Sequence, residues 1–213
     1  MSKSKSRVQT AVIVVAVIAV VLAIAIAVAS IVGGDDESTD TAGSSIVVAV
    51  SSGFSSAEEA ATAYAKAVSA ERSASTLEEL IEARYDMLEC WNSAVLQALV
   101  DRSDYDDYEE FVITEMYGSE TEAEAMVDIY SRLYGSGVIF TLEPGDYLDS
   151  DEVADIQDEI DELGLDLVVD SARSIEGSYT KSASDGTVTK SSVGFSGTSL
   201  IEIDGVWYIW TNF

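Results

Sequence analysis

The chain contains no histidine among its 213 residues, and it contains one cysteine and one proline. The lack of histidine excludes a Ser-His-Asp mechanism and removes the commonest zinc ligand. The single cysteine, Cys90, cannot form an internal disulfide, and no histidine is present to activate it as a nucleophile. We therefore expect Cys90 to act as a small hydrophobic residue within a helix, and the sequence assigns no catalytic residue.

Basic residues are also scarce, with 11 lysines and arginines against 39 aspartates and glutamates, a formal net charge of −28. Three of the basic residues precede position 33, whereas every acidic residue follows it. Such a charge repels phosphate backbones and anionic lipid headgroups, which excludes nucleic acid as a partner. It favours a solubilising surface, a salty surrounding or cationic partners.

Charge is entirely absent from residues 11–32, an apolar run whose only hydroxyl belongs to Ser30. At about 1.5 Å per residue, the run matches the roughly 30 Å hydrocarbon core of a bilayer. Basic residues precede it and acidic residues follow it, so the positive-inside rule places residues 1–10 in the cytoplasm. The sequence thus predicts a single-pass protein of the cell membrane, with a transmembrane helix over residues 11–32.

A cleaved secretory signal is the main alternative, because Ala27-Val28-Ala29 resembles a cleavage site. The run is longer than the roughly 7–15 apolar residues of such a signal, which favours an uncleaved anchor. No cysteine adjoins the run, which excludes a lipid anchor, and the helix-rich remainder does not suit a pilin. Residues 33–52 are expected to be a linker, and residues 53–213 an extracytoplasmic domain.

Helical periodicity dominates the first half of that domain. Capping boxes at Ser55 or Ser56 and at Thr76 mark two helix starts. Four helices are expected, at about residues 57–70, 76–100, 108 onward and 120–134. Arg84 falls within the apolar stripe of the second helix, so its guanidinium must be paired or reach the edge of the core.

Strand patterns dominate the second half. The sequence predicts a strand at residues 138–142, a helix capped by Ser150, and strands at about residues 165–180, 187–195, 200–203 and 206–210. Asp204-Gly205 predicts a two-residue type I′ turn. The last strand carries Trp207 and Ile209 on one face and bulky aromatic residues on the other, so both faces are expected to be covered.

One acidic stretch, residues 104–110, resembles a calcium-binding loop in composition. A loop of the EF-hand type needs glycine at its sixth position, where this chain has Glu109. The stretch is better interpreted as the charged start of a helix, with Tyr108, Phe111 and Val112 turned inward. We expect no metal ligands and no cofactor, although calcium is the cation that this loop would suit.

Two segments resemble a known family. GFSSAEEAATAYAKAV at residues 53–68 resembles the opening helix of SnoaL-like, nuclear-transport-factor-like cone domains. LEPGDYLDSDEVADIQDEIDELGL, with the closing IDGVWYIW, is similar to bacterial surface domains of that superfamily. The resemblance implies an α+β domain, in which a curved antiparallel sheet packs on helices and the first helix closes its concave side. The family's enzymes use histidine, or aspartate with tyrosines, inside the cone, and no such residues can be matched here.

These observations favour a membrane-anchored extracytoplasmic domain that binds a small apolar ligand or another protein, without evident catalysis. Trp207 is expected in the core, with Tyr208 or Trp210 as a pocket wall. The candidate ligand-binding residues are Tyr64, Trp91, Phe140, Tyr208 and Trp210.

Two alternatives remain. A pocket enzyme of the isomerase or cyclase type would need a carboxylate with a raised pKa, buried among aromatic residues such as Tyr64, Trp91, Phe140 and Trp207. A structural component of a surface or secretion assembly would need a large exposed apolar patch.

Overall fold

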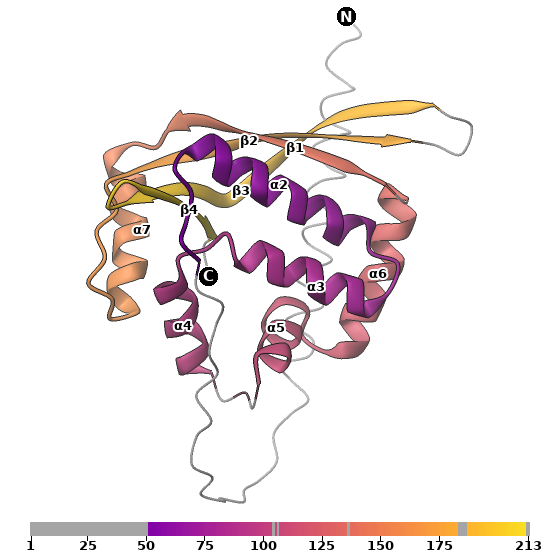
Figure 1. Ribbon diagram of the computed structural model, residues 1–213, viewed down its shortest axis with the longest axis horizontal. Helices are drawn as coiled ribbons and strands as arrows, with labels where there is room; N and C mark the ends of the chain where they lie inside the picture. The colour runs from indigo at the N-terminus through magenta and orange to yellow at the C-terminus, as the bar shows by residue number, and fades with distance from the viewer. Residues whose placement is uncertain (1–50, 104, 106, 136, 183–186, 212–213) are drawn as a thin grey trace, which may run out of the picture. The chain divides into compact units, whose positions relative to one another are not determined.

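An α+β architecture is confirmed in the computed structural model, which describes residues 51–103, 105, 107–135, 137–182 and 187–211. This described part contains six helices and one antiparallel sheet of four strands (Figure 1). The helices are α2 (Ala57–Ser73), α3 (Leu77–Leu88), α4 (Ser93–Arg102), α5 (Tyr108–Tyr117), α6 (Glu120–Tyr134) and α7 (Ser150–Glu162). The strands are β1 (Ile139–Tyr147), β2 (Ser171–Ser182), β3 (Val188–Ile203) and β4 (Val206–Thr211).

Side-chain caps define the helix starts. Ser56 and Thr76 accept hydrogen bonds from backbone N–H groups of α2 and α3, as the sequence predicts. The expected cap of α7 was Ser150, but Asp149 takes this position and forms a full capping box with Glu152. Aspartate suits the place because its carboxylate accepts two backbone N–H groups and also faces the positive end of the helix dipole.

The predicted long helix over residues 76–100 is wrong, since the chain breaks into α3 and α4. Asn92 starts α4 by accepting hydrogen bonds from the backbone of Ala94 and Val95. The carbonyl of Cys90 accepts the backbone N–H of Ile209 in β4. Between α3 and α4, a backbone carbonyl therefore bonds to the sheet instead of continuing the helix. The helical spacing of apolar residues continues through this break, which is why the sequence predicts one long helix.

The sheet has the strand order β1-β2-β3-β4, with every neighbouring pair antiparallel. The predicted turn between β3 and β4 is confirmed, because Asp204 and Gly205 both have positive φ, at 53° and 75°. Two strands were expected at residues 187–195 and 200–203, but β3 is continuous through both.

The sequence also predicts a strand from residue 165, whereas β2 begins at Ser171. Gln157 of α7 supplies the reason, since its amide accepts the backbone N–H of Val169 and donates to the carbonyl of Leu167. A side chain thus satisfies the backbone groups that a neighbouring strand would have satisfied.

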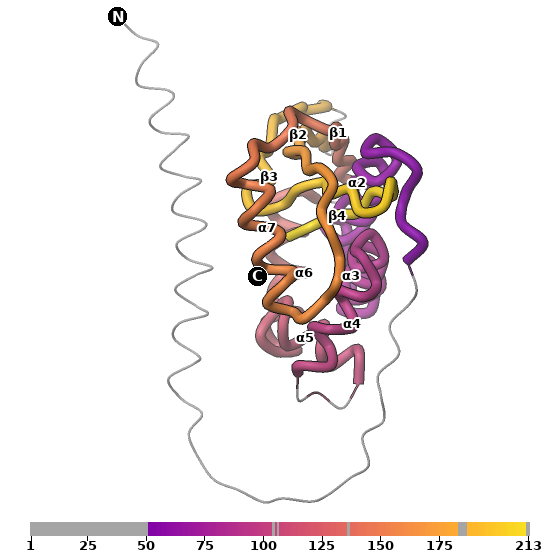
Figure 2. Tube along the Cα trace, turned by 90° about the vertical axis from the view of Figure 1, so that its left-hand side faces the viewer, coloured from indigo at the N-terminus to yellow at the C-terminus, as the bar shows by residue number. Residues whose placement is uncertain are grey.

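Two apolar clusters lie on opposite faces of the sheet. Trp207 and Ile209 of β4 pack in the cluster that contains α2, and Tyr208 and Trp210 pack in the cluster that contains α7. Figure 2 shows α2 and α7 on opposite sides of β4. The prediction that both faces of this strand are covered is confirmed.

Both edges of the sheet are partly closed by other elements. Ser69 of α2 accepts the backbone N–H of Phe140 in β1, at 2.8 Å, so this N–H points away from β2. At the opposite edge, Phe54 exchanges two backbone hydrogen bonds with Trp207. Helix α2 contacts both edge strands, β1 and β4, as well as β3.

No helix in the described part of the chain is long and apolar enough to cross a membrane. The predicted transmembrane helix at residues 11–32 and most of the predicted linker lie outside the described residues. All described residues belong to one compact unit.

Candidate functional site

The five predicted ligand-binding residues are all buried, but the sheet divides them into two groups. Tyr64, Trp91 and Phe140 lie on the α2 face, in the cluster that also contains Trp207. Tyr208 and Trp210 lie on the opposite face, against α7. The residues predicted as a pocket wall therefore face away from the first helix, whereas Trp207 faces it.

Tyr64 and Phe140 belong to a larger set of rings, which we call the aromatic cluster. It consists of Tyr64 of α2, Tyr134 of α6, Phe140 of β1, Tyr179 of β2 and Phe195 of β3. Adjacent ring centroids are 5.4–6.4 Å apart, and most contacts are edge to face. Tyr134, Tyr179 and Phe195 are only partly buried, so the cluster reaches the surface.

A glycine in β2 makes room for this arrangement. A Cβ atom at Gly177 would lie 2.8 Å from the ring of Phe195 and 2.9 Å from a methyl group of Leu142. No side chain could occupy that position without moving one of these neighbours. Gly177 is therefore part of the packing that sets the position of the Phe195 ring.

A buried carboxylate lies near the end of α2. Glu71 is completely buried, and one of its oxygens accepts hydrogen bonds from Arg84 of α3 and from Tyr117 of α5, the latter at 2.9 Å. Its other oxygen lies 3.5 Å from the guanidinium of Arg72. Arg72 in turn lies over the ring of Tyr130 in α6, 4.0 Å from the centroid. The group joins four helices around a single negative charge.

The electrostatic balance keeps this carboxyl group ionised. Burial alone would raise the pKa of Glu71, but the charges of Arg84 and Arg72 and the hydrogen bonds from Tyr117 and Arg84 hold it below its ordinary value. The Arg84 guanidinium is likewise desolvated, yet the charge of Glu71 raises its pKa. Neither group can exchange a proton near neutral pH.

The aromatic cluster adjoins this ion pair. Burial raises the pKa of Tyr64 to about 12, and the charges of Arg84, Glu71 and Arg72 also act on its hydroxyl. Burial likewise raises the pKa of Tyr134, whose hydroxyl interacts with the charges of Arg72 and Glu71. The end of the cluster that carries the hydroxyls of Tyr64 and Tyr134 is therefore polar, whereas Phe140 and Phe195 contribute only hydrocarbon.

Cys90 is buried, and burial raises the pKa of its thiol to about 12. A thiol of this kind is not a nucleophile at neutral pH, which agrees with the hydrophobic role predicted for it.

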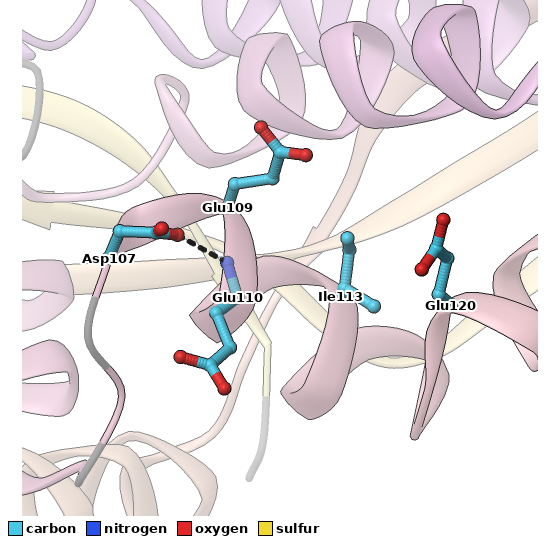
Figure 3. Close-up of a pocket in the computed structure, with 5 residues that line it drawn as sticks. All are labelled: Asp107, Glu109, Glu110, Ile113 and Glu120. Atoms are coloured by element: carbon cyan, nitrogen blue, oxygen red, sulfur yellow. Dashed lines mark hydrogen bonds between the residues drawn. The ribbon is translucent and has the colours of Figure 1, made fainter.

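The predicted acidic stretch at residues 104–110 begins α5. Asp107 caps the helix by accepting the backbone N–H of Glu110 at 2.8 Å. Phe111 and Val112 are buried as predicted, whereas Tyr108, also predicted to turn inward, is only partly buried. A shallow depression of about 350 Å³ lies at this place. Figure 3 shows the side chains that line it. It is lined by Asp107, Glu109, Glu110, Ile113 and Glu120.

These carboxylates do not converge on one point. The side chains of Glu109 and Glu110 point in different directions, and Ile113 stands between Glu109 and Glu120 (Figure 3). Among the described residues, no three His, Cys, Asp or Glu side chains are grouped closely enough to hold a metal ion. Asp104 and Asp106 of the stretch lie outside the described residues.

Sequence reasoning missed Glu71, because it is one of many glutamates in amphipathic helices. Arg84, its partner, is the residue that could have pointed to it. Because Arg84 interrupts an apolar stripe, its guanidinium needs a hydrogen-bond acceptor in or near the core. The prediction that Arg84 must be paired or reach an edge is confirmed by its bond to Glu71.

Comparison with known proteins shows no matching family model, no matching curated protein and no matching solved structure.

Proposed function

We propose that this chain is a membrane-anchored extracytoplasmic binding domain of the SnoaL-like cone type, and that its aromatic cluster receives a small apolar ligand. The observation that carries the proposal is the cluster itself: rings from two helices and three strands gather on the α2 face and remain open to the surface. Partly exposed aromatic side chains offer large rigid apolar surfaces at a low entropic cost of ordering.

The contacts of α2 support the cone. In a flat sheet with this strand order, β1 and β4 would lie about 14 Å apart, at roughly 4.8 Å per strand. A helix is only about 10–12 Å wide with its side chains. Helix α2 nevertheless contacts both β1 and β4, as is expected if the sheet curves around it. Figure 1 shows α2 lying against the sheet.

The state of Glu71 favours binding over catalysis. An isomerase or cyclase of the kind considered above needs a carboxyl group whose pKa is raised, so that it can carry or accept a proton near neutral pH. Glu71 is buried beside Tyr64, but its arginine partners lower its pKa. Burial does raise the pKa of Glu159, a partly buried residue of α7 whose side chain is hydrogen-bonded to that of Trp210, but this pair lies on the other face of the sheet from the aromatic cluster.

The membrane anchor rests on the sequence, through the uncharged run at residues 11–32 and the basic residues before it. A net negative domain held outside the membrane would be repelled by anionic headgroups, which keeps its binding face in solution.

Thermal unfolding with a neutral aromatic probe tests the binding proposal. 2-Naphthol added to the full chain in lipid nanodiscs should raise the melting temperature, because a ligand that binds only the folded state stabilises it. Phe195→Ala should abolish the increase. Val188→Ala removes an exposed apolar side chain from the same strand, outside the cluster, and should retain it. An equal increase in melting temperature for wild type, Phe195→Ala and Val188→Ala would refute binding at the cluster.

A further inference from the structure

A second surface, formed by α3 and α5, carries a stack of three aromatic rings. The rings of Tyr85 and Tyr108 lie nearly parallel, with centroids 5.3 Å apart and an angle of 14° between their planes. Phe111 continues the stack, 5.9 Å from Tyr108 at an angle of 10°. Phe111 is buried, whereas both tyrosines are partly exposed. The stack therefore presents aromatic surface to the solvent.

Carboxylates lie near the two tyrosines of this stack. The charges of Glu109 and Asp107 act on the hydroxyl of Tyr85, and the charge of Glu89 acts on that of Tyr108. Asp107 and Glu109 also line the depression in Figure 3. The tyrosine stack and the depression are consequently adjacent parts of one surface.

The negative charge of this surface is not balanced by neighbouring residues in the sequence. Residues 103–131 contain ten aspartates and glutamates and no lysine or arginine. The salt bridges of the described residues engage Glu71, Asp128 and Glu58. None of them includes Glu89, Asp107, Glu109 or Glu120. Within the described part of the chain, no arginine or lysine forms a salt bridge with these four carboxylates or lies over the rings of Tyr85 and Tyr108.

Arginine is the side chain that fits both features. Its planar guanidinium stacks on an aromatic face, and its N–H groups form paired hydrogen bonds with carboxylates. Arg72 and Arg84 already make such contacts within this protein, each over a tyrosine ring and beside Glu71. Lysine has the charge without the planar group, so it satisfies only the electrostatic part of the surface.

We propose that the surface formed by Tyr85, Tyr108 and the α5 depression binds an arginine-rich segment of another protein. Charge complementarity provides attraction over distance, and stacking on the tyrosines provides the preference for arginine over lysine. This surface shares no residue with the aromatic cluster, so the inference does not depend on the proposed ligand.

Binding of two charge-matched peptides to the full chain in nanodiscs tests this inference. Hexa-arginine should bind more tightly than hexa-lysine, and the affinity of both should fall as salt rises. Tyr85→Leu keeps an apolar side chain but removes the ring, and should weaken hexa-arginine binding about two- to fivefold while leaving hexa-lysine binding unchanged.

A charge variant separates this surface from the net charge of the protein. Glu109→Gln with Glu120→Gln should weaken the binding of both peptides, and both positions are exposed, so folding should be unaffected. Asp155→Asn with Asp158→Asn makes the same change in net charge on exposed positions of α7 and serves as the control. Equal weakening by the two double variants, or equal affinity for the two peptides, would overturn the proposal.

Discussion

At the scale of single residues, the ion pair between Glu71 and Arg84 places a charged group in the protein interior. A carboxylate with no exposure to solvent is tolerated only because two arginines and a tyrosine hydroxyl compensate for its lost hydration. The same compensation removes it from acid–base chemistry. The buried pair thus holds the helices together in one arrangement. The proposed ligand-binding site consists instead of uncharged aromatic side chains.

Removing either partner of this pair should be strongly destabilising. Arg84→Met leaves Glu71 buried beside Arg72 alone, and we expect a loss of about 3–5 kcal/mol in the free energy of unfolding. Glu71→Leu combined with Arg84→Met should lose much less than the sum of the two single variants, because neither charge is left unpaired. Chemical denaturation of the three variants measures this, and additive losses would show that the pair is not coupled.

Acid should reveal the same carboxylate. Because folding lowers the pKa of Glu71 below its ordinary 4.5, its contribution to stability is complete above that value and is lost as pH falls further, through the folded-state pKa. Wild-type stability should therefore decrease below about pH 4.5. Glu71→Gln carries no titrating group there, and its stability should fall less steeply over the same interval. Parallel curves would contradict the assignment.

Gly177 provides a second test at this scale. Gly177→Ala places a methyl group against Phe195 and Leu142, and overpacking of this kind costs about 1–3 kcal/mol. Gly194→Ala is the matched control. Gly194 lies on the neighbouring strand, and no heavy atom would lie within 4 Å of the Cβ atom added there. Combining Gly177→Ala with Phe195→Leu should recover part of the loss, which urea denaturation can measure.

At the scale of elements, the sequence predicts those features of the fold that depend on residues within a single helix, strand or turn. The caps at Ser56 and Thr76, the stripe that buries Leu80 and Ile81, and the turn at Asp204-Gly205 all follow from residues a few positions apart. These signals also established the α+β class and the two-sided burial of β4.

The predictions that are wrong involve partners distant in sequence. At the break between α3 and α4, the backbone N–H of Ile209 donates a hydrogen bond to the carbonyl of Cys90, and at the late start of β2 the side chain of Gln157 bonds to the backbone. The candidate site has the same origin. The sequence singles out Tyr64 and Phe140 as conspicuous aromatic residues. Tyr179 and Phe195 join them through the pairing of β1 with β2 and of β2 with β3, and Tyr134 joins them from α6 by packing on Phe140 and Tyr179.

The turn between β3 and β4 is the element whose alteration has the clearest consequence. Gly205 has φ of +75° and no heavy atom near its missing Cβ, so Gly205→Val tests backbone strain alone. We expect a cost of about 1–3 kcal/mol. Asp204→Asn, which tolerates the same left-handed conformation, should be nearly neutral. Thermal unfolding distinguishes them, and equal stability of Gly205→Val and wild type would contradict a type I′ turn.

At the scale of the whole molecule, the uncharged run at residues 11–32 predicts one orientation of the chain in the membrane. If residues 11–32 remain as an anchor with the N-terminus inside, protease added to intact cells should remove the domain and leave the anchor in the membrane. Protection of the domain from protease, or its release at a mass that matches cleavage after Ala29, would contradict the anchored arrangement.

The central claim is that the aromatic cluster on the α2 face is a binding surface. Nuclear Overhauser effects between 2-naphthol and the rings of the full chain in nanodiscs test it most directly. We expect transfer to Tyr134, Tyr179 and Phe195, the partly exposed members of the cluster, and none to Tyr208 or Trp210 on the α7 face. Transfer confined to Tyr208 and Trp210, or no transfer to any ring, would contradict the claim.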